Sequence, residues 1–275
     1  ARAALLTGRY GVRVGVPHVL GPGDSYGLSD AETTIPKMLK TAGYRSACIG
    51  KWHLGSAARF LPTQHGFDEF YGLLHSNDQG TSIMQDTRIV EEQAPFDSLT
   101  QKFTNRAVDF IRRSKDTPFL LYLSHTAPHV PLVPSAAFRR KSRTGVYGDV
   151  VEELDWGIGQ VLNELSANGL DENTLVIFTS DNGPWFQGST GRLRGRKGDT
   201  FEGGLRVPFL ARYKARIPQG SVVNGFATML DVFPTLASLA GAPLPRAPLD
   251  GVDIWPMLSG EAESVTRPPF LYFDS

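Results

Sequence analysis

Strand-like and helix-like patterns alternate along this chain, and that order constrains the fold more than any other feature. Short apolar runs bounded by turn residues predict buried strands, whereas longer segments with apolar residues at helical spacing predict helices. This alternation is typical of an α/β fold, so we expect a largely parallel central sheet with helices on both faces. The 275 residues are an ordinary length for one such domain.

The expected elements follow from the apolar spacing and from the glycines and prolines near their ends. We expect strands over residues 46–49, 119–123, 175–178, 207–211 and 269–273, with 175–178 as the clearest central strand. We expect helices over residues 3–6, 32–42, 102–113, 148–167 and 230–240. A loop rich in glycine and arginine is predicted over residues 188–198.

The charge balance and the cysteine content exclude several functional classes. With 28 basic and 28 acidic residues, the chain has no net charge that would favour nucleic acid or a membrane surface. No apolar run approaches the roughly 20 residues that span a bilayer. Cys48 is the only cysteine, so neither an internal disulfide nor a four-cysteine zinc site can form within these residues.

Unusual polar residues follow three of the expected strands directly. Because ligands bind beyond the carboxyl ends of strands in open α/β sheets, this repeated placement predicts a site there. The residues are, in chain order, Lys51 and His53, His125 and His129, and Asp181 and Asn182. Each pair alone also fits an ordinary loop, with His125 more typical of a structural residue, and the basic run over residues 192–197 fits a solvated surface loop.

Taken together, the polar residues match the needs of one chemistry. The Asp181 carboxylate and the Asn182 carbonyl suit a hard cation, Ca²⁺ or alternatively Mg²⁺, but leave most of its coordination sphere to other residues. Lys51, Lys197 and His129 are donors that can surround a small tetrahedral oxyanion. The combination favours cleavage of a charged ester by a cation and a positively charged cage.

His53 completes this set as a general acid or base near neutral pH. The reaction also needs a nucleophile and further anionic metal ligands, and no residue of the chain is an obvious candidate for either.

Several segments closely resemble the type I, formylglycine-dependent sulfatases of the alkaline phosphatase superfamily. The similarity runs in order from residue 1 to about residue 260, and residues 74–80 and 147–155 are most similar to the arylsulfatase A and N-acetylgalactosamine-6-sulfatase branch. The other matching segments are residues 1–9, 43–55, 176–184 and 195–208. The resemblance implies hydrolysis of aryl or carbohydrate sulfate esters.

The resemblance also implies roles for individual residues. Arg2 matches an arginine that holds the formylglycine in place, and Lys51 matches a lysine that bridges this nucleophile and the sulfate. His53 matches a histidine that takes a proton from the formylglycine diol. His129 matches a histidine beside the leaving-group oxygen, and Lys197 matches a lysine on the sulfate.

Three further positions match substrate or metal ligands of the family. Ser76 corresponds to a serine near the sulfate, and Asp181 and Asn182 correspond to two of the calcium ligands. The formylglycine, made from a Cys or Ser by a formylglycine-generating enzyme, and the other two calcium ligands are expected upstream of Ala1. Cys48 is followed by Ile-Gly-Lys, so it does not match the formylglycine precursor.

These correspondences give a set of further expectations. Residues 1–260 form a sulfatase core without its first strand, and residues 261–275 begin a C-terminal subdomain. The 275-residue chain alone is expected to be inactive and to bind Ca²⁺ weakly. The substrate is a sulfated small molecule or glycan, chosen by rim loops over residues 76–92 and 185–194. The family suggests a periplasmic, secreted or lysosomal location.

Two other functions fit the same residues. A phosphodiester or phosphonate monoester hydrolase of the same superfamily shares the fold and much of the cage. A non-catalytic relative that binds sulfated glycans is the alternative from a different class. Retention of all the charged site residues argues against such a relative, because binding alone does not need them.

Overall fold

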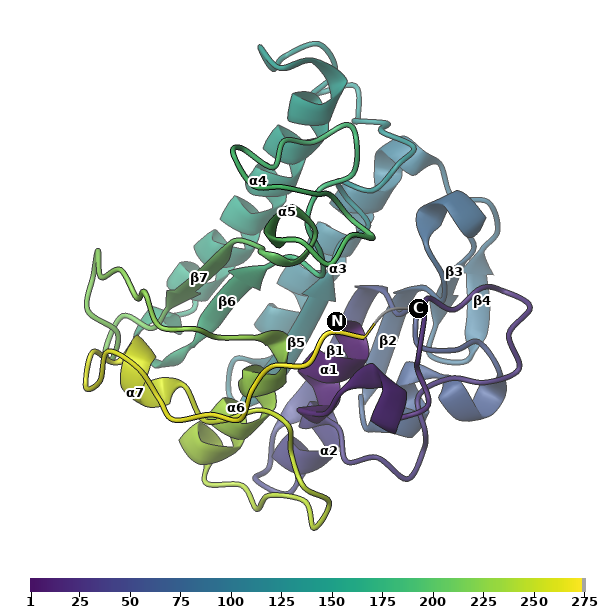
Figure 1. Cartoon of the computed structure of the whole chain (residues 1–275). Helices are drawn as coiled ribbons and strands as arrows, with labels where there is room; N and C mark the ends of the chain where they lie inside the picture. Colours follow the sequence, from purple (N-terminus) through teal and green to yellow (C-terminus); the bar gives the residue numbers. More distant parts are fainter. Residues whose placement is uncertain (274–275) are drawn as a thin grey trace.

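The computed structural model describes residues 1–273, and its main element is a five-stranded sheet (Figure 1). The strands lie in the order β4-β3-β2-β1-β5, with β1 parallel to both β2 and β5 and with β3 and β4 antiparallel at one edge. Their bounds are β1 Arg45–Lys51, β2 Glu69–Leu73, β3 Ile83–Gln85, β4 Arg88–Glu91 and β5 Phe119–Ser124.

A second, two-stranded sheet pairs β6 (Val176–Thr179) with β7 (Phe209–Arg212) in antiparallel fashion. The sequence places β6 correctly but makes it the central strand of one large sheet. Among the described residues β6 pairs only with β7 and is not part of the five-stranded sheet, so the prediction of a central strand is wrong for these residues. An apolar run predicts a buried strand, but it does not specify which neighbours supply the hydrogen bonds.

Helices cover both faces of the five-stranded sheet, as the alternating pattern predicts (Figure 1). Ala47 and Ile49 of β1 pack against α3 (Leu99–Ser114), which in turn contacts α4 (Gly145–Ala167). Cys48, which points to the opposite face, packs with α1 (Arg2–Thr7). Helices α2 (Ile35–Lys40) and α6 (Val232–Ala240) form a further cluster on the α1 side. The α/β fold class is therefore confirmed.

The remaining elements are short. They are α5 (Glu202–Leu205), α7 (Trp255–Leu258) and the 3₁₀ turns Gly11–Arg13, Ala58–Phe60, Pro62–His65, Asn77–Gln79, Phe96–Ser98, Asp171–Asn173 and Met229–Asp231.

Several of the expected bounds of helices and strands differ from those in the structure. The helix expected over residues 32–42 begins only at Ile35, because Thr34 caps it by accepting a hydrogen bond from the Lys37 backbone nitrogen at 3.4 Å.

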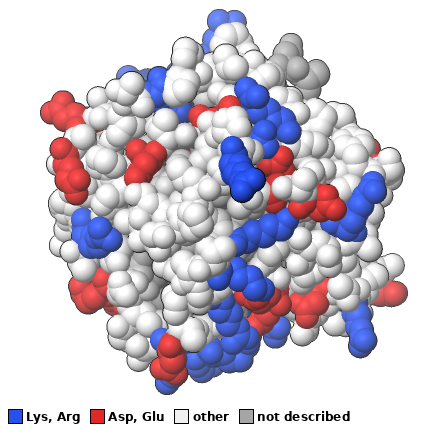
Figure 2. Space-filling model, turned by 90° about the horizontal axis from the view of Figure 1, so that it is seen from below, with Lys and Arg blue, Asp and Glu red and all other residues white. Residues whose placement is uncertain are grey.

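The strand expected over residues 269–273 is absent, since these residues carry no regular secondary structure. Of the expected C-terminal subdomain start, residues 274–275 lie outside the described part of the chain. No helix of the described residues is long and apolar enough to cross a membrane. Figure 2 shows basic and acidic side chains interspersed over the face seen from below, in agreement with the balanced composition.

Two glycines allow the strands to approach closely just before the site. Gly50 of β1 is in register with Gly72 of β2 and with Ser124 of β5. A Cβ atom on Gly72 would overlap the Gly50 carbonyl oxygen, and Gly50 itself has φ 106°, which favours glycine. The residue after Gly50 is Lys51, so this close packing fixes where the strand end presents its side chain.

The substitution Gly72→Ala should therefore destabilise the fold by about 1–3 kcal/mol, because the added methyl group overlaps backbone atoms that cannot move aside independently. The matched control is Gly159→Ala in the middle of α4, where a Cβ atom meets no other atom within 4 Å. Since alanine favours the helix, we expect Gly159→Ala to raise the free energy of unfolding by about 0.5–1 kcal/mol. Urea denaturation of both variants measures the difference, and equal stabilities would contradict the packing argument.

Candidate active site

The polar residues predicted from the sequence gather at the carboxyl ends of β1, β2 and β5. Lys51 is the last residue of β1, and the chain then follows the end of β2, with the Trp52 and His53 nitrogens donating to the Leu73 and Leu74 carbonyls at 2.8 and 2.9 Å. His53 has φ 59°, a left-handed conformation that is uncommon outside glycine. The two backbone hydrogen bonds hold the turn in which His53 adopts this conformation.

Lys51, Ser76 and His129 form the centre of the site. The Lys51 Nζ donates to Ser76 Oγ at 3.1 Å, and Ser76 Oγ lies 3.4 Å from His129 Nδ1. Lys51 and Ser76 are only 6% and 3% exposed, so their polar atoms are fixed with little access to bulk water. Ser76 is itself held by a capping box with Gln79 at the start of a 3₁₀ turn.

The environment of His129 defines its protonation state. Its Nδ1 lies 2.7 Å from the Val130 carbonyl, which can only accept, so Nδ1 carries the hydrogen and Nε2 is the nitrogen that remains available. Burial is the largest influence and lowers the pKa of His129, the hydrogen bond to the Val130 carbonyl raises it, and the positive charges of Lys51 and Lys197 lower it further, so the pKa lies below its usual value. The carboxylate of Asp78, 3.8 Å from Nδ1, acts in the opposite direction.

Arg2 connects three parts of the fold at this site. Its NH1 group donates to the Lys51 carbonyl at 2.6 Å and to the Tyr122 hydroxyl at 3.2 Å. Its Nε lies 3.3 Å from the carboxylate of Asp181, which follows β6. The Ser124 hydroxyl donates to the same Lys51 carbonyl at 2.6 Å. Lys51 is therefore fixed by its backbone as well as by its amine.

Burial and like charges shift the titration of these groups. Burial, with a further contribution from Arg2 and Lys197, lowers the pKa of Lys51 to about 8. Removal from water opposes ionisation of Asp181, but the charges of Arg2 and Lys51 outweigh it and lower the pKa of its carboxyl group. The site thus keeps an excess of positive charge at neutral pH, which is the electrostatic requirement for binding an anion.

His53 is set apart from the central group by its own contacts. Its Nε2 lies 2.8 Å from the Leu20 carbonyl and therefore carries the hydrogen, which leaves Nδ1 as the basic nitrogen. Burial and then the charge of Lys51 lower the pKa of His53 to about 4. The ring is neutral at physiological pH and lies 6.2 Å from that of His75.

Lys197 and the two predicted metal ligands lie on the β6 side of the site. The Lys197 backbone nitrogen donates to the Pro184 carbonyl at 3.0 Å, and its charge acts on the pKa values of both Lys51 and His129. The Asn182 side-chain nitrogen donates to the Gly183 carbonyl at 2.8 Å, which leaves its amide oxygen for another partner. Asp181 and Asn182 thus offer the oxygen donors that a hard cation prefers.

The oxygens of Asp181 and Asn182 are the kind of ligand that a hard cation prefers, but two residues are too few to complete its coordination sphere. Calcium takes about six to eight oxygen ligands, and no group of three His, Cys, Asp or Glu residues within residues 1–273 is arranged to hold a metal ion. The remaining ligands would have to come from elsewhere.

The structure also identifies residues that sequence reasoning missed. Tyr122 lies within the apolar strand β5, where nothing in the sequence distinguishes it from a core residue. Asp78 lies two residues after Ser76, the only residue of its segment that was predicted to belong to the site. His125 follows β5 as expected, but its ring packs 6.3 Å from that of Phe103 and both ring nitrogens are buried without a partner. Burial of the ring lowers the pKa of His125 to about 4, and the ring packs beside the core residue Phe103, which fits its structural interpretation.

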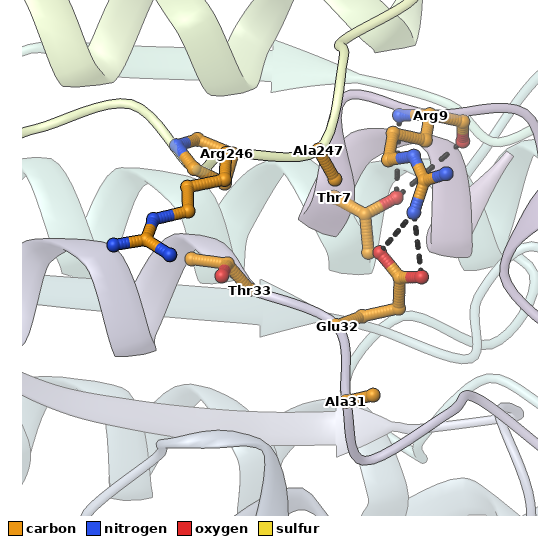
Figure 3. Close-up of a pocket in the computed structure, with 8 residues that line it drawn as sticks. Thr7, Arg9, Ala31, Glu32, Thr33, Arg246 and Ala247 are labelled. Carbon is orange, nitrogen blue, oxygen red and sulfur yellow. Dashed lines mark hydrogen bonds and ion pairs between the residues drawn. The ribbon is translucent and has the colours of Figure 1, made fainter.

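A cavity of about 300 Å³ lies away from these residues, beyond the carboxyl end of α1 (Figure 3). It is lined by Thr7, Arg9, Glu32, Thr33 and Arg246, together with small residues. The Arg9 guanidinium contacts both oxygens of Glu32, at 2.6 and 2.7 Å, so these two charges neutralise each other. None of the predicted site residues lines this cavity, and it is not the active-site candidate.

Comparison with known proteins agrees with the geometry. The sulfatase family matches residues 1–242. Arylsulfatase A of Homo sapiens is 39% identical over 99% of this chain and 60% of its own length, and N-acetylgalactosamine-6-sulfatase of Canis lupus familiaris is 37% identical over 99% and 58%. The solved PsFucS1 sulfatase from Pseudoalteromonas sp. has a TM-score of 0.87 at 31% identity, covering 94% of this chain and 61% of that one.

The chain thus spans about 60% of the length of the curated relatives it matches. The matched residues 1–242 span the positions from Arg2 to Lys197, and the roles of the individual site residues remain predictions. The chain belongs to the sulfatase family.

Proposed function

We propose that this protein hydrolyses sulfate esters, and that its 275 residues supply most of the sulfate-binding part of the active site. The observation that supports this most directly is the convergence of Lys51, Ser76 and His129 at the strand ends of a chain of the sulfatase family. A sulfate monoester carries a single negative charge. The positive charges of Lys51, Lys197 and Arg2 surround and stabilise the charge that develops on its oxygens during cleavage.

Each residue of the chain has a defined task in this proposal. Lys51 and Lys197 bind the sulfate oxygens, while Ser76 orients the Lys51 amine. His129 faces the leaving group through Nε2, since its Nδ1 is already engaged with Val130. His53, neutral and with Nδ1 free of its proton, accepts a proton from the nucleophile. Arg2 positions Lys51 and Asp181 relative to each other.

The nucleophile and the cation complete the reaction in this proposal. A formylglycine, made by a formylglycine-generating enzyme, would supply the nucleophilic oxygen that bonds to sulfur as the bond between sulfur and the leaving alcohol breaks, and His53 would accept its proton. The buried Arg2 guanidinium bonds the Lys51 carbonyl and the Tyr122 hydroxyl and pairs with Asp181, so it positions the groups that would surround such a nucleophile. Ca²⁺ supplies additional positive charge when bound, with Asp181 and Asn182 as two of its ligands.

A protein that contains these 275 residues and carries a formylglycine should cleave 4-nitrophenyl sulfate faster than bis(4-nitrophenyl) phosphate. Both compounds carry one negative charge, but the sulfate monoester offers three unsubstituted oxygens to the donors of Lys51, Lys197 and His129, whereas the diester offers two and adds a second aryl group. Release of 4-nitrophenol measures both rates under the same conditions. A faster rate with the phosphodiester would favour the phosphodiester or phosphonate hydrolase function. The absence of turnover with either compound, despite tight binding of sulfated glycans, would favour a non-catalytic relative.

The 275-residue chain alone should show no turnover of 4-nitrophenyl sulfate, even with added Ca²⁺. Its only cysteine, Cys48, is fully buried, and burial raises the pKa of the thiol, so Cys48 cannot act as the nucleophile or be modified where it stands. Calcium binding should be weak, because Asp181 and Asn182 supply only part of a coordination sphere. Circular dichroism provides the control that the chain is folded, and measurable turnover would refute the prediction.

The substitution Lys51→Ala should weaken binding of inorganic sulfate to the chain by about 10- to 100-fold, as expected for loss of one hydrogen bond from a charged, buried donor. The matched control is Lys115→Ala, at an exposed position after α3. Binding to the unsubstituted chain should weaken as the pH rises through about 8, because the Lys51 ammonium then loses its proton. Calorimetric titration between pH 6 and 10 measures both effects. A pH profile that Lys51→Ala leaves unchanged would contradict the assignment.

A further inference from the structure

The loop between Pro184 and Phe201 exposes an unusual pair of aromatic side chains beside the site. Trp185 is 47% exposed and Phe186 is 67% exposed, although both are large and apolar. Their rings lie 4.7 Å apart in an edge-to-face arrangement, so they form one apolar surface. Exposed aromatic pairs of this kind typically mark a binding site and not a core.

The basic residues of this loop are held in place by stacking and hydrogen bonding. The Arg194 guanidinium lies 3.7 Å from the centre of the Phe201 ring, and that of Arg196 lies 5.1 Å from the centre of the Phe186 ring. Arg196 also donates to the Trp185 and Gly188 carbonyls at 3.3 and 3.4 Å. The loop is thus an ordered surface in which planar cations alternate with aromatic rings.

The loop carries more positive charge than its acidic residues balance. Arg192, Arg194, Arg196 and Lys197 fall within six consecutive positions. The carboxylate of Asp199 accepts a hydrogen bond from the Arg196 backbone nitrogen at 2.9 Å and so is occupied with holding the turn. Arg192 and Arg194 are exposed, which leaves their guanidinium groups accessible to a ligand.

The loop is joined directly to the proposed sulfate site. The Lys197 backbone nitrogen bonds to the Pro184 carbonyl at 3.0 Å, and Gly183, two residues after Asp181, bonds to the Gly204 carbonyl at 2.8 Å. In Figure 1 this segment lies beside α5, above the end of β6. The segment that carries Lys197 therefore also carries the aromatic pair and the exposed guanidinium groups of Arg192 and Arg194.

We propose that this loop is a substrate subsite for sulfated oligosaccharides that carry a second anionic group near the sulfate to be cleaved. The apolar face of a sugar ring packs on Trp185 and Phe186, and the second sulfate or carboxylate binds Arg192 and Arg194. A small aryl sulfate has one charge and would leave both arginines without an anionic partner, so charge complementarity favours the oligosaccharide. This inference rests on the proposed sulfate ester hydrolysis and specifies the class of substrate.

Calorimetry with three probes tests the subsite on the 275-residue chain. The probes are a disaccharide with two sulfates, the same disaccharide with one sulfate, and 4-nitrophenyl sulfate. The double substitution Arg192→Ser with Arg194→Ser should weaken binding of the disulfated probe about tenfold and leave binding of 4-nitrophenyl sulfate unchanged. The substitution Trp185→Ala should weaken binding of both disaccharides several-fold. The control Arg246→Ser with Lys115→Ser also removes two positive charges, at the separate cavity and at the exposed end of α3, and should change binding of none of the probes.

If the double substitution weakened binding of all three probes equally, or did not weaken binding of the disulfated probe, the proposed subsite would be wrong. In a protein that contains these residues and carries a formylglycine, the double substitution should raise KM for the disulfated substrate with kcat unchanged, and should leave hydrolysis of the aryl sulfate intact. The two proposals fail in different ways. If sulfate esters are bound with the expected preference but never cleaved, the proposed hydrolysis is wrong and the subsite remains; if they are cleaved without that preference, the subsite is wrong.

Discussion

The arrangement of the site depends on the buried guanidinium of Arg2. It joins the end of β1 through the Lys51 carbonyl, β5 through Tyr122, and the segment after β6 through Asp181. The two sheets share no backbone ladder among the described residues, so this side chain is a direct polar link between them at the site. A charge in such a position is costly to bury alone. Loss of Arg2 would leave Asp181 without its closest positive partner, and the two halves of the site would no longer be tied together.

The same region concentrates positive charge where water is scarce, which a fold selected only for stability would avoid. Arg2 and Lys197 both disfavour the charged form of Lys51, and Lys51 and Lys197 disfavour that of His129. The repulsion among these groups is a standing cost to the folded state. A bound anion reduces this repulsion, so the free energy that destabilises the empty folded state contributes to the affinity for the anion. This trade is common at functional sites, where local rules of stability are broken for a purpose.

The sequence predicted where several candidate residues lie, while their roles stay predictions, and it predicted less of the surrounding structure. Strand ends and motif spacing located Lys51, His129 and Asp181, because chemistry at the ends of strands is encoded locally. Tyr122 could not be found in this way, because it sits in an apolar strand and acquires its role only when Arg2 reaches it from α1. The pairing of β6 and the short strands β3 and β4 were missed for a related reason, since hydrogen-bonding partners depend on distant segments.

The near-neutral titration of Lys51 has a consequence for the thermodynamics of binding. An anion placed against the Lys51 amine stabilises its charged form, so at pH values near 8 part of the protein population must take up a proton when the anion binds. The heat of binding will then include the heat released or absorbed by the buffer that gives up that proton. Two buffers of equal pH but different ionisation enthalpy will report different binding enthalpies for one and the same ligand, and the difference counts the protons transferred.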